Sequence, residues 1–94
     1  MLSKNKIKYI RSLELKKNRK EAQAFLAEGH KLVGDLLGHF PCQLIVATPR
    51  WLHTHPEVQA DEIIEVTDEE LSRASLLKAP QEVLAVFTQP QYPL

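Results

Sequence analysis

The chain has 94 residues, of which 44% are hydrophobic and 26% charged, and its formal net charge is zero. This size and composition indicate one globular domain with a single core, below the usual size of an enzyme that runs several chemical steps. No apolar run approaches the roughly 20 residues of a membrane-spanning helix, and the lone cysteine, Cys42, excludes an internal disulfide. We therefore expect a cytoplasmic protein without a membrane partner.

The zero net charge conceals a strong separation of charge along the chain. Nine basic and three acidic residues lie between Met1 and Lys31, an excess of six positive charges, whereas the remainder holds three basic and nine acidic residues. A basic segment of this kind attracts polyanions, and the phosphates of RNA or DNA are the usual ones. A soluble, disordered leader is the alternative interpretation, and charge alone does not separate the two.

The first predicted element is a basic N-terminal helix with two different faces. Ser3 can cap this helix, which is expected to run to about Glu14. Ile7, Ile10 and Leu13 recur at a spacing of three and form an apolar stripe. A second face carries basic residues at i, i+4 and i+7, which are Lys4, Lys8 and Arg11.

Strands and helices then alternate to the end of the chain. Residues 16–20 have no apolar period and are predicted to be an exposed connector. Strands are expected over residues 22–27, 44–47, 62–66 and 83–87, with helices beginning after Gly29, Thr48 and Thr67. The alternation predicts an α/β fold, a three-layer α/β/α sandwich with a mostly parallel central sheet.

We divide the chain into three expected segments. These are the basic helix and connector (residues 1–20), the α/β domain (21–88) and a Pro-rich linker (89–94). Because proline-rich segments of this kind act as spacers, the linker is expected to lead into a further domain.

The residues that could carry chemistry form no catalytic set. Cys42 has no obvious partner and is interpreted as a structural thiol. His53 and His55 could share a metal ion, but no cysteine or acidic cluster accompanies them. Trp51 could stack on a base, although an anchor in the core is the preferred interpretation. The glycines match neither a phosphate-binding loop nor a dinucleotide fingerprint, so we expect a binding module without a catalytic site.

Four motifs in chain order resemble one known family. They are Asn5, Ile7 and Lys8 with Arg11-Ser12-Leu13; Arg19 ahead of Phe25-Leu26-Ala27-Glu28-Gly29; Leu32-Val33; and Ala79-Pro80-Gln81 ahead of Val83-Leu84-Ala85-Val86. Together they resemble the N-terminal substrate-binding domain of the SpoU/TrmH RNA 2′-O-ribose methyltransferases, over nearly the whole chain. Glu82 is a departure, because that family usually has glycine at this position of the turn.

The resemblance implies a fold like that of the kink-turn-binding ribosomal proteins of the large subunit. It also implies a C-terminal catalytic domain, missing here, that binds S-adenosylmethionine and methylates a ribose 2′-hydroxyl in rRNA or tRNA. This chain would then bind structured RNA, hold no cofactor and be catalytically silent alone. The sequence leaves open whether the parent protein is a homodimer, and whether the N-terminal helix is docked before RNA arrives.

The charged face and the family pattern together select the candidate RNA-binding residues. Lys8, Arg11 and Arg19 are the first choices, with less specific attraction from Lys4, Lys16, Lys17 and Lys20. We expect alanine at Arg11 or Arg19 to weaken RNA binding without changing thermal stability.

Two short motifs have either a structural role or a role in RNA contact. They are Glu28-Gly29, for which the structural role is preferred, and Pro80-Gln81. A different class of function also stays open, that of a protein-interaction or dimer-assembly module. In that alternative the apolar stripe of Ile7, Ile10 and Leu13 docks on a catalytic partner.

Overall fold

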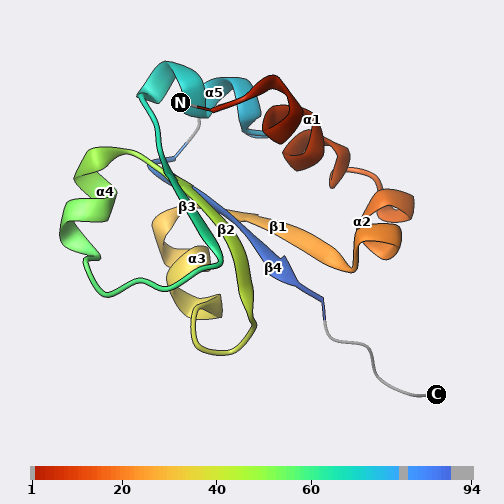
Figure 1. The fold of residues 1–94 in the computed structure, drawn as a ribbon, viewed down its shortest axis with the longest axis horizontal. Helices are drawn as coiled ribbons and strands as arrows, with labels where there is room; N and C mark the ends of the chain where they lie inside the picture. The colour runs from red at the N-terminus through yellow and green to blue at the C-terminus, as the bar shows by residue number, and fades with distance from the viewer. Residues whose placement is uncertain (1, 79–80, 90–94) are drawn as a thin grey trace.

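Helices cover both faces of one four-stranded sheet in the computed structural model, which describes residues 2–78 and 81–89 (Figure 1). The helices are α1 (Lys4–Ser12), α2 (Lys16–Ala22), α3 (His30–Leu36), α4 (Pro49–Thr54) and α5 (Asp68–Ala74). The strands are β1 (Ala24–Glu28), β2 (Cys42–Ala47), β3 (Glu62–Glu65) and β4 (Val83–Thr88). None of the helices in the described part is long and apolar enough to cross a membrane.

The sheet is mixed, so the prediction of a mostly parallel sheet was wrong. Its strand order is β1-β4-β2-β3. β2 and β3 are parallel, but β4 lies between β1 and β2 and is antiparallel to both. The α/β class itself is confirmed, and the likeness to kink-turn-binding ribosomal proteins stays a prediction.

β4 is antiparallel to β2 because it starts at the end of the sheet where β3 stops. Ala47 pairs with Glu65 at the end of β3 and with Val83 at the start of β4, so these two positions flank the same residue of β2. The connection from β3 to β4 therefore begins and ends at the same end of the sheet, whereas the connection through α4 returns the chain from the end of β2 to the start of β3.

Alternate residues of the central strands enter two separate cores. On β2, Leu44 and Val46 pack with α1 and α5, whereas Ile45 and Ala47 pack with α3 and α4. β4 is buried from Val83 to Phe87 for the same reason, since helices cover it on both sides. The continuous apolar runs that predicted strands buried on both faces are thus confirmed, although the surrounding sheet is not parallel.

Helix α1 is docked on the body of the protein through the apolar stripe. Ser3 caps the helix by accepting the N–H of Lys6 at 3.1 Å. Ile10 and Leu13 are 0% and 1% exposed in the core that α1 shares with α5, and Ile7 packs against them. The stripe is therefore covered by this chain itself, which removes the apolar surface on which the assembly-module alternative depended.

Residues 16–22 form helix α2, so the prediction of a connector over residues 16–20 was wrong. The helix also crosses the boundary that we expected at residue 20. Lysine, arginine, glutamate and alanine are good helix formers, and a short surface helix does not require a broad apolar stripe. Ala22 alone of its side chains packs against the core, and Gln23 ends the helix in the left-handed region at φ 53°.

Glu70 joins the start of α5 to the N-terminal segment. The capping box that the sequence predicted is present, because the Thr67 hydroxyl accepts the Glu70 N–H and the Glu70 carboxylate accepts the Thr67 N–H, each at 3.1 Å. The other carboxylate oxygen accepts the N–H of Leu2 at 3.2 Å. The Thr67 bond first, and then the Leu2 bond, lower the pKa of the Glu70 carboxyl from its ordinary value.

Glu70 should make folding stability depend on pH in the acid range. Because its pKa is lower in the folded state, its contribution is complete above the unfolded value, about 4.3, and is lost as the pH falls through the folded value. Urea unfolding between pH 7 and pH 3 should therefore show a smaller loss of stability for Glu70→Gln than for the wild type. Glu57→Gln, which changes an exposed carboxylate, is the control and should follow the wild type. Equal pH dependence in all three proteins would contradict the assignment.

Candidate nucleic-acid interface

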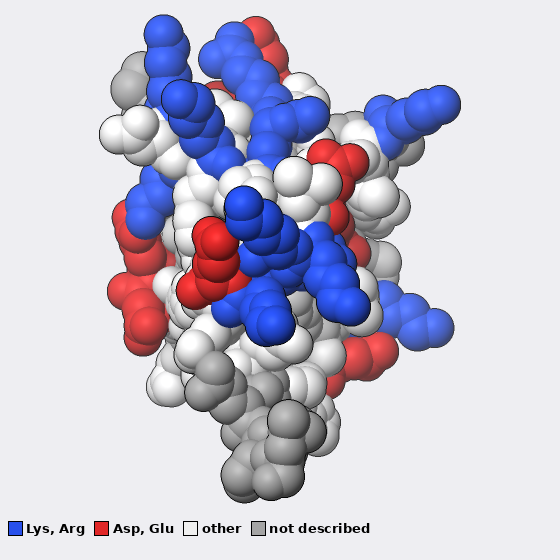
Figure 2. Space-filling model, turned by 90° about the vertical axis from the view of Figure 1, so that its right-hand side faces the viewer, with Lys and Arg blue, Asp and Glu red and all other residues white. Residues whose placement is uncertain are grey.

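Helices α1 and α2 form a basic surface on one side of the molecule. Residues 2–23 contain eight basic and two acidic side chains, and Figure 2 shows how lysine and arginine gather on the side where α2 lies in Figure 1. Five lysines of these helices are exposed and have no ion-pair partner among the described residues. We call these five the basic face: Lys4, Lys8, Lys16, Lys17 and Lys20. Lys6 is different, because its Nζ pairs with Glu62 at 2.5 Å.

Arg11, one of the three first choices, is bonded to the end of another helix. Its Nη1 donates to the carbonyl oxygens of Ser75 at 3.0 Å and Arg73 at 3.4 Å. The last carbonyls of a helix lack partners within the helix and carry partial negative charge, so a guanidinium at the end of α5 stabilises it. Arg11 therefore has a structural role in joining α1 to α5.

Arg19 fixes the corner between α1 and α2. Its Nη1 donates to the carbonyl oxygens of Leu13 at 2.9 Å and Glu14 at 2.8 Å. Asn18 adds a bond from its side-chain amide to the carbonyl of Ser12 at 2.9 Å. The carbonyls of residues 12–14, at and directly after the end of α1, thus all accept side-chain donors from α2. Lys8, the remaining first choice, is exposed and belongs to the basic face.

Glu28 holds the segment that follows α5. Its carboxylate accepts the hydroxyl of Ser75, and its Oε2 accepts the N–H of Leu76 at 2.8 Å. Ser75 is only 4% exposed, so a charged acceptor there replaces water for a buried hydroxyl. This geometry gives Glu28 a structural role, because both oxygens are bonded to the segment that follows α5.

Gly29 makes the turn between β1 and α3. Its φ of 97° lies in the left-handed region that favours glycine, and its N–H donates to the carbonyl of Val83 at 2.9 Å. A Cβ at this position would lie 3.4 Å from the Cγ of Gln81, an ordinary contact, so the backbone angle rather than space requires glycine. Gln81 also lines a hollow of about 420 Å³ together with Gly29. Pro80, predicted with Gln81, lies outside the described residues.

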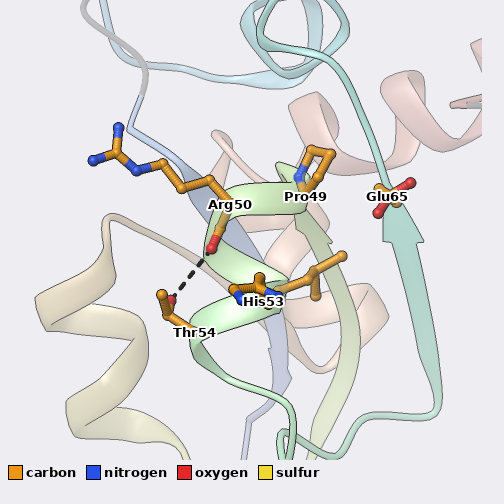
Figure 3. Close-up of a pocket in the computed structure, with 6 residues that line it drawn as sticks. Pro49, Arg50, His53, Thr54 and Glu65 are labelled. Atoms are coloured by element: carbon orange, nitrogen blue, oxygen red, sulfur yellow. Dashed lines mark hydrogen bonds between the residues drawn. The ribbon is translucent and has the colours of Figure 1, made fainter.

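A second hollow, of about 640 Å³, lies beside α4, but its residues form no catalytic set (Figure 3). Within it the Thr54 hydroxyl donates to the carbonyl of Arg50 at 3.4 Å, and the Arg50 side chain extends away from His53. Glu65 reaches this hollow from β3. The Thr54 hydroxyl also lies 2.9 Å from the carbonyl of Trp51 and 2.9 Å from Nδ1 of His55, and that Nδ1 is itself 2.9 Å from the Trp51 carbonyl. These contacts are local to the end of α4, and we assign them a structural role.

The tryptophan, histidine and cysteine candidates have contacts that indicate structural roles. Trp51 is 1% exposed, which confirms the core anchor, and its ring stacks on His55 with 4.1 Å between centroids. No group of three or more histidine, cysteine or acidic residues suited to a metal ion occurs within residues 2–78 and 81–89. Burial raises the pKa of the Cys42 thiol, which is bonded to the Leu44 carbonyl at 3.5 Å and is therefore a poor nucleophile.

The family follows from comparison with known proteins. Residues 4–85 match the model of the MRM3-like substrate binding domain, which covers most of the chain. The chain belongs to this family. The resemblance to the substrate-binding domain of SpoU/TrmH RNA methyltransferases is thereby confirmed. Among curated proteins, none matches the chain.

Solved structures agree with this assignment. A protein of the TrmH family of RNA methyltransferases from Porphyromonas gingivalis is 38% identical over 100% of the chain, with a TM-score of 0.90. An rRNA methyltransferase from Sinorhizobium meliloti with bound AdoMet is 30% identical over 99% of the chain, with a TM-score of 0.76. The SpoU methyltransferase AviRb from Streptomyces viridochromogenes shares the fold, with a TM-score of 0.79 at 21% identity over 98% of the chain. The chain spans 36–38% of the length of these three proteins.

Arg11 and Arg19 should each contribute to stability, contrary to the expectation from the sequence. Alanine at either position removes two hydrogen bonds to helix-end carbonyls, and we expect a loss of about 1 kcal/mol in the free energy of unfolding. Lys8→Ala is the matched control, since it shortens a long basic side chain on α1 and should change stability by less than about 0.5 kcal/mol. Urea unfolding of the three variants checks this, and equal stabilities would refute the structural role of the arginines.

Substitution of Glu28 should lower the free energy of unfolding more than substitution of Arg11 or Arg19. Glu28→Ala leaves the Ser75 hydroxyl and the Leu76 N–H without their acceptor, at a cost of about 1–3 kcal/mol. Glu28→Gln keeps an acceptor and should lose less, and Glu57→Ala, at an exposed position, should lose least. The same urea titration gives this order, and a Glu28→Ala protein as stable as Glu57→Ala would contradict the assignment.

Proposed function

We propose that this chain recognises structured rRNA or tRNA for an S-adenosylmethionine-dependent 2′-O-ribose methyltransferase, and that it binds the RNA through the basic face. Membership in a substrate-binding family supports the first part. The second rests on one observation, that five exposed lysines of α1 and α2 have no ion-pair partner among the described residues.

Lysines on a fixed scaffold suit the recognition of folded RNA. Proteins bind structured RNA largely through its phosphates and its shape, because the deep major groove of an RNA helix is closed to side chains. The basic face is carried by two helices whose corner is held by Arg19 and Asn18. The lysines therefore start from defined backbone positions, although each side chain is free to follow a phosphate.

The methyltransferase reaction itself belongs, in this proposal, to a catalytic domain that follows residue 89. The N–H of Gln89 donates to the carbonyl of Gln23 at 2.7 Å, so the chain leaves β4 beside the end of α2. RNA on the basic face would then lie close to the point at which the chain continues. Such a protein would work in the cytoplasm, where its RNA substrates are.

The glycines of the described residues do not suit a site for S-adenosylmethionine. Gly29, Gly34 and Gly38 lie at the start of α3, inside it and after it, and form no loop that could surround a nucleoside. We therefore assign the cofactor to the proposed catalytic domain, where it would supply the methyl group. The role of this chain is to bind and orient RNA.

Fluorescence anisotropy across a salt series tests the proposal with labelled rRNA fragments and tRNA. Replacing Lys8, Lys16, Lys17 and Lys20 together by glutamine should weaken binding about tenfold or more at low salt. Because each lost phosphate contact removes about 0.7–0.9 from the slope of log K against log salt, the slope should also become shallower.

Lys31→Gln with Lys78→Gln is the control, because both lysines are exposed and lie outside α1 and α2. This pair should change affinity and slope little. If the quadruple variant keeps the affinity and slope of the wild type, the basic face is not the RNA-binding surface. If the wild type binds no structured RNA at low salt, the proposed function itself fails.

A further inference from the structure

We infer that Leu15, at the corner between α1 and α2, contacts an unpaired nucleobase of the bound RNA. The inference rests on the proposed function and specifies the class of RNA. A basic face that contacts phosphates alone would bind a continuous duplex and an interrupted one about equally. An apolar contact to an unpaired base would favour RNA that contains a bulge or loop.

Leu15 is unusual among the apolar side chains of the described residues. It is 60% exposed, more than Leu32, Leu77 or Ile63, the other large hydrophobic residues with exposed side chains. It also interrupts the basic segment, since Lys16 and Lys17 follow it directly and α2 begins there. An apolar group in solvent among positive charges is suited to a ligand that is anionic and also has an apolar surface.

The backbone around Leu15 is held firmly in place. Its own N–H donates to the carbonyl of Ser12 at 3.2 Å, and its carbonyl accepts the N–H groups of Asn18 at 3.0 Å and Arg19 at 3.1 Å. The side chains of Asn18 and Arg19 bind the carbonyls of residues 12–14. The corner is thus fixed before RNA binds, so little backbone entropy is lost when Leu15 makes a contact.

A nucleobase is the occupant that agrees with both the charge and the apolar side chain. Proteins place leucine and other apolar residues against or between bases, and sequence-dependent recognition of RNA occurs mainly at loops and bulges, where bases are unstacked. In a continuous RNA helix the bases are stacked, so Leu15 would meet only sugars and phosphates. The lysines of the basic face would hold the flanking backbone.

Two RNAs of equal length test the inference, one fully paired and one with a single bulged nucleotide. Wild-type protein should prefer the bulged RNA, and Leu15→Gln should lose about three- to tenfold in affinity for it while binding the paired RNA as before. Leu15→Met keeps an apolar side chain of similar size and should retain the preference. The slope of log K against log salt should not change in either variant, because no phosphate contact is removed.

Ile63→Thr is the control, since Ile63 is an exposed apolar residue on β3, at the edge of the sheet far from β1 and α2. This variant should bind both RNAs like the wild type. An equal loss for both RNAs in Leu15→Gln, or no loss for either, overturns the contact between Leu15 and the base. Both results leave the proposed function standing as long as the wild type binds RNA, and thermal unfolding confirms that each variant is folded.

Discussion

The position of β4 is the constraint on which the rest of the structure depends. This strand is the only one that pairs with β1 within the described sheet, and it also pairs with β2, so it joins β1 to the other strands. Two backbone bonds fix its start: Gly29 donates to Val83, and Thr48 donates to Glu82 at 3.0 Å. Because Gly29 and Thr48 precede α3 and α4, the entry of β4 also fixes the helices on one face. The Glu28 carboxylate, at the end of β1, binds Ser75 and Leu76 directly after α5.

On the other face of the sheet, arginine and lysine have different roles. A guanidinium has several donors in a fixed plane and can bind two carbonyl oxygens, whereas a lysine carries one compact charge on a flexible stem. Arg11 and Arg19 accordingly bind carbonyls at the ends of α5 and α1. The lysines of the basic face have no such bonds among the described residues. The same excess of positive charge thus builds the scaffold with one residue type and presents charge to solvent with the other.

Local patterns predicted the elements well, and non-local contacts account for the errors. The cap at Ser3, the capping box at Thr67 and the apolar stripe of α1 depend on residues close in sequence, and all were found. The direction of β4 depends on the end of the sheet at which the chain enters this strand. The alternation of strands and helices in the sequence does not reveal that end. Helix α2 was missed because its sequence has no apolar period, although the helix propensity of its lysines, Arg19, Glu21 and Ala22 favours a helix.

The candidate site shows the same limit, because a charge pattern locates a surface but does not assign the role of each residue. Arg11 shares a helical face with Lys4 and Lys8 in sequence, yet its partners are the carbonyls of Arg73 and Ser75, more than 60 positions away. Those partners become visible only when α1 is docked beside α5. In the sequence alone, the three basic residues of this face differ in no way that predicts separate roles. Motif resemblance selected Arg11 and Arg19, but it does not separate a residue that builds the interface from one that contacts the ligand.

Net charge is likewise a poor guide to how this domain meets a polyanion. Five of the ten acidic residues from Glu28 onward have local partners: Glu62, Glu69 and Glu82 pair with basic side chains, while the carboxylates of Glu28 and Glu70 accept N–H or O–H donors. The lysines of the basic face are not compensated in this way within the described residues. Charges in physiological salt are screened over about 8 Å. A ligand at that face is therefore attracted by the nearby lysines, and the zero net charge of the whole chain has little effect on it. A domain with no net charge can therefore present a strongly positive surface in one direction.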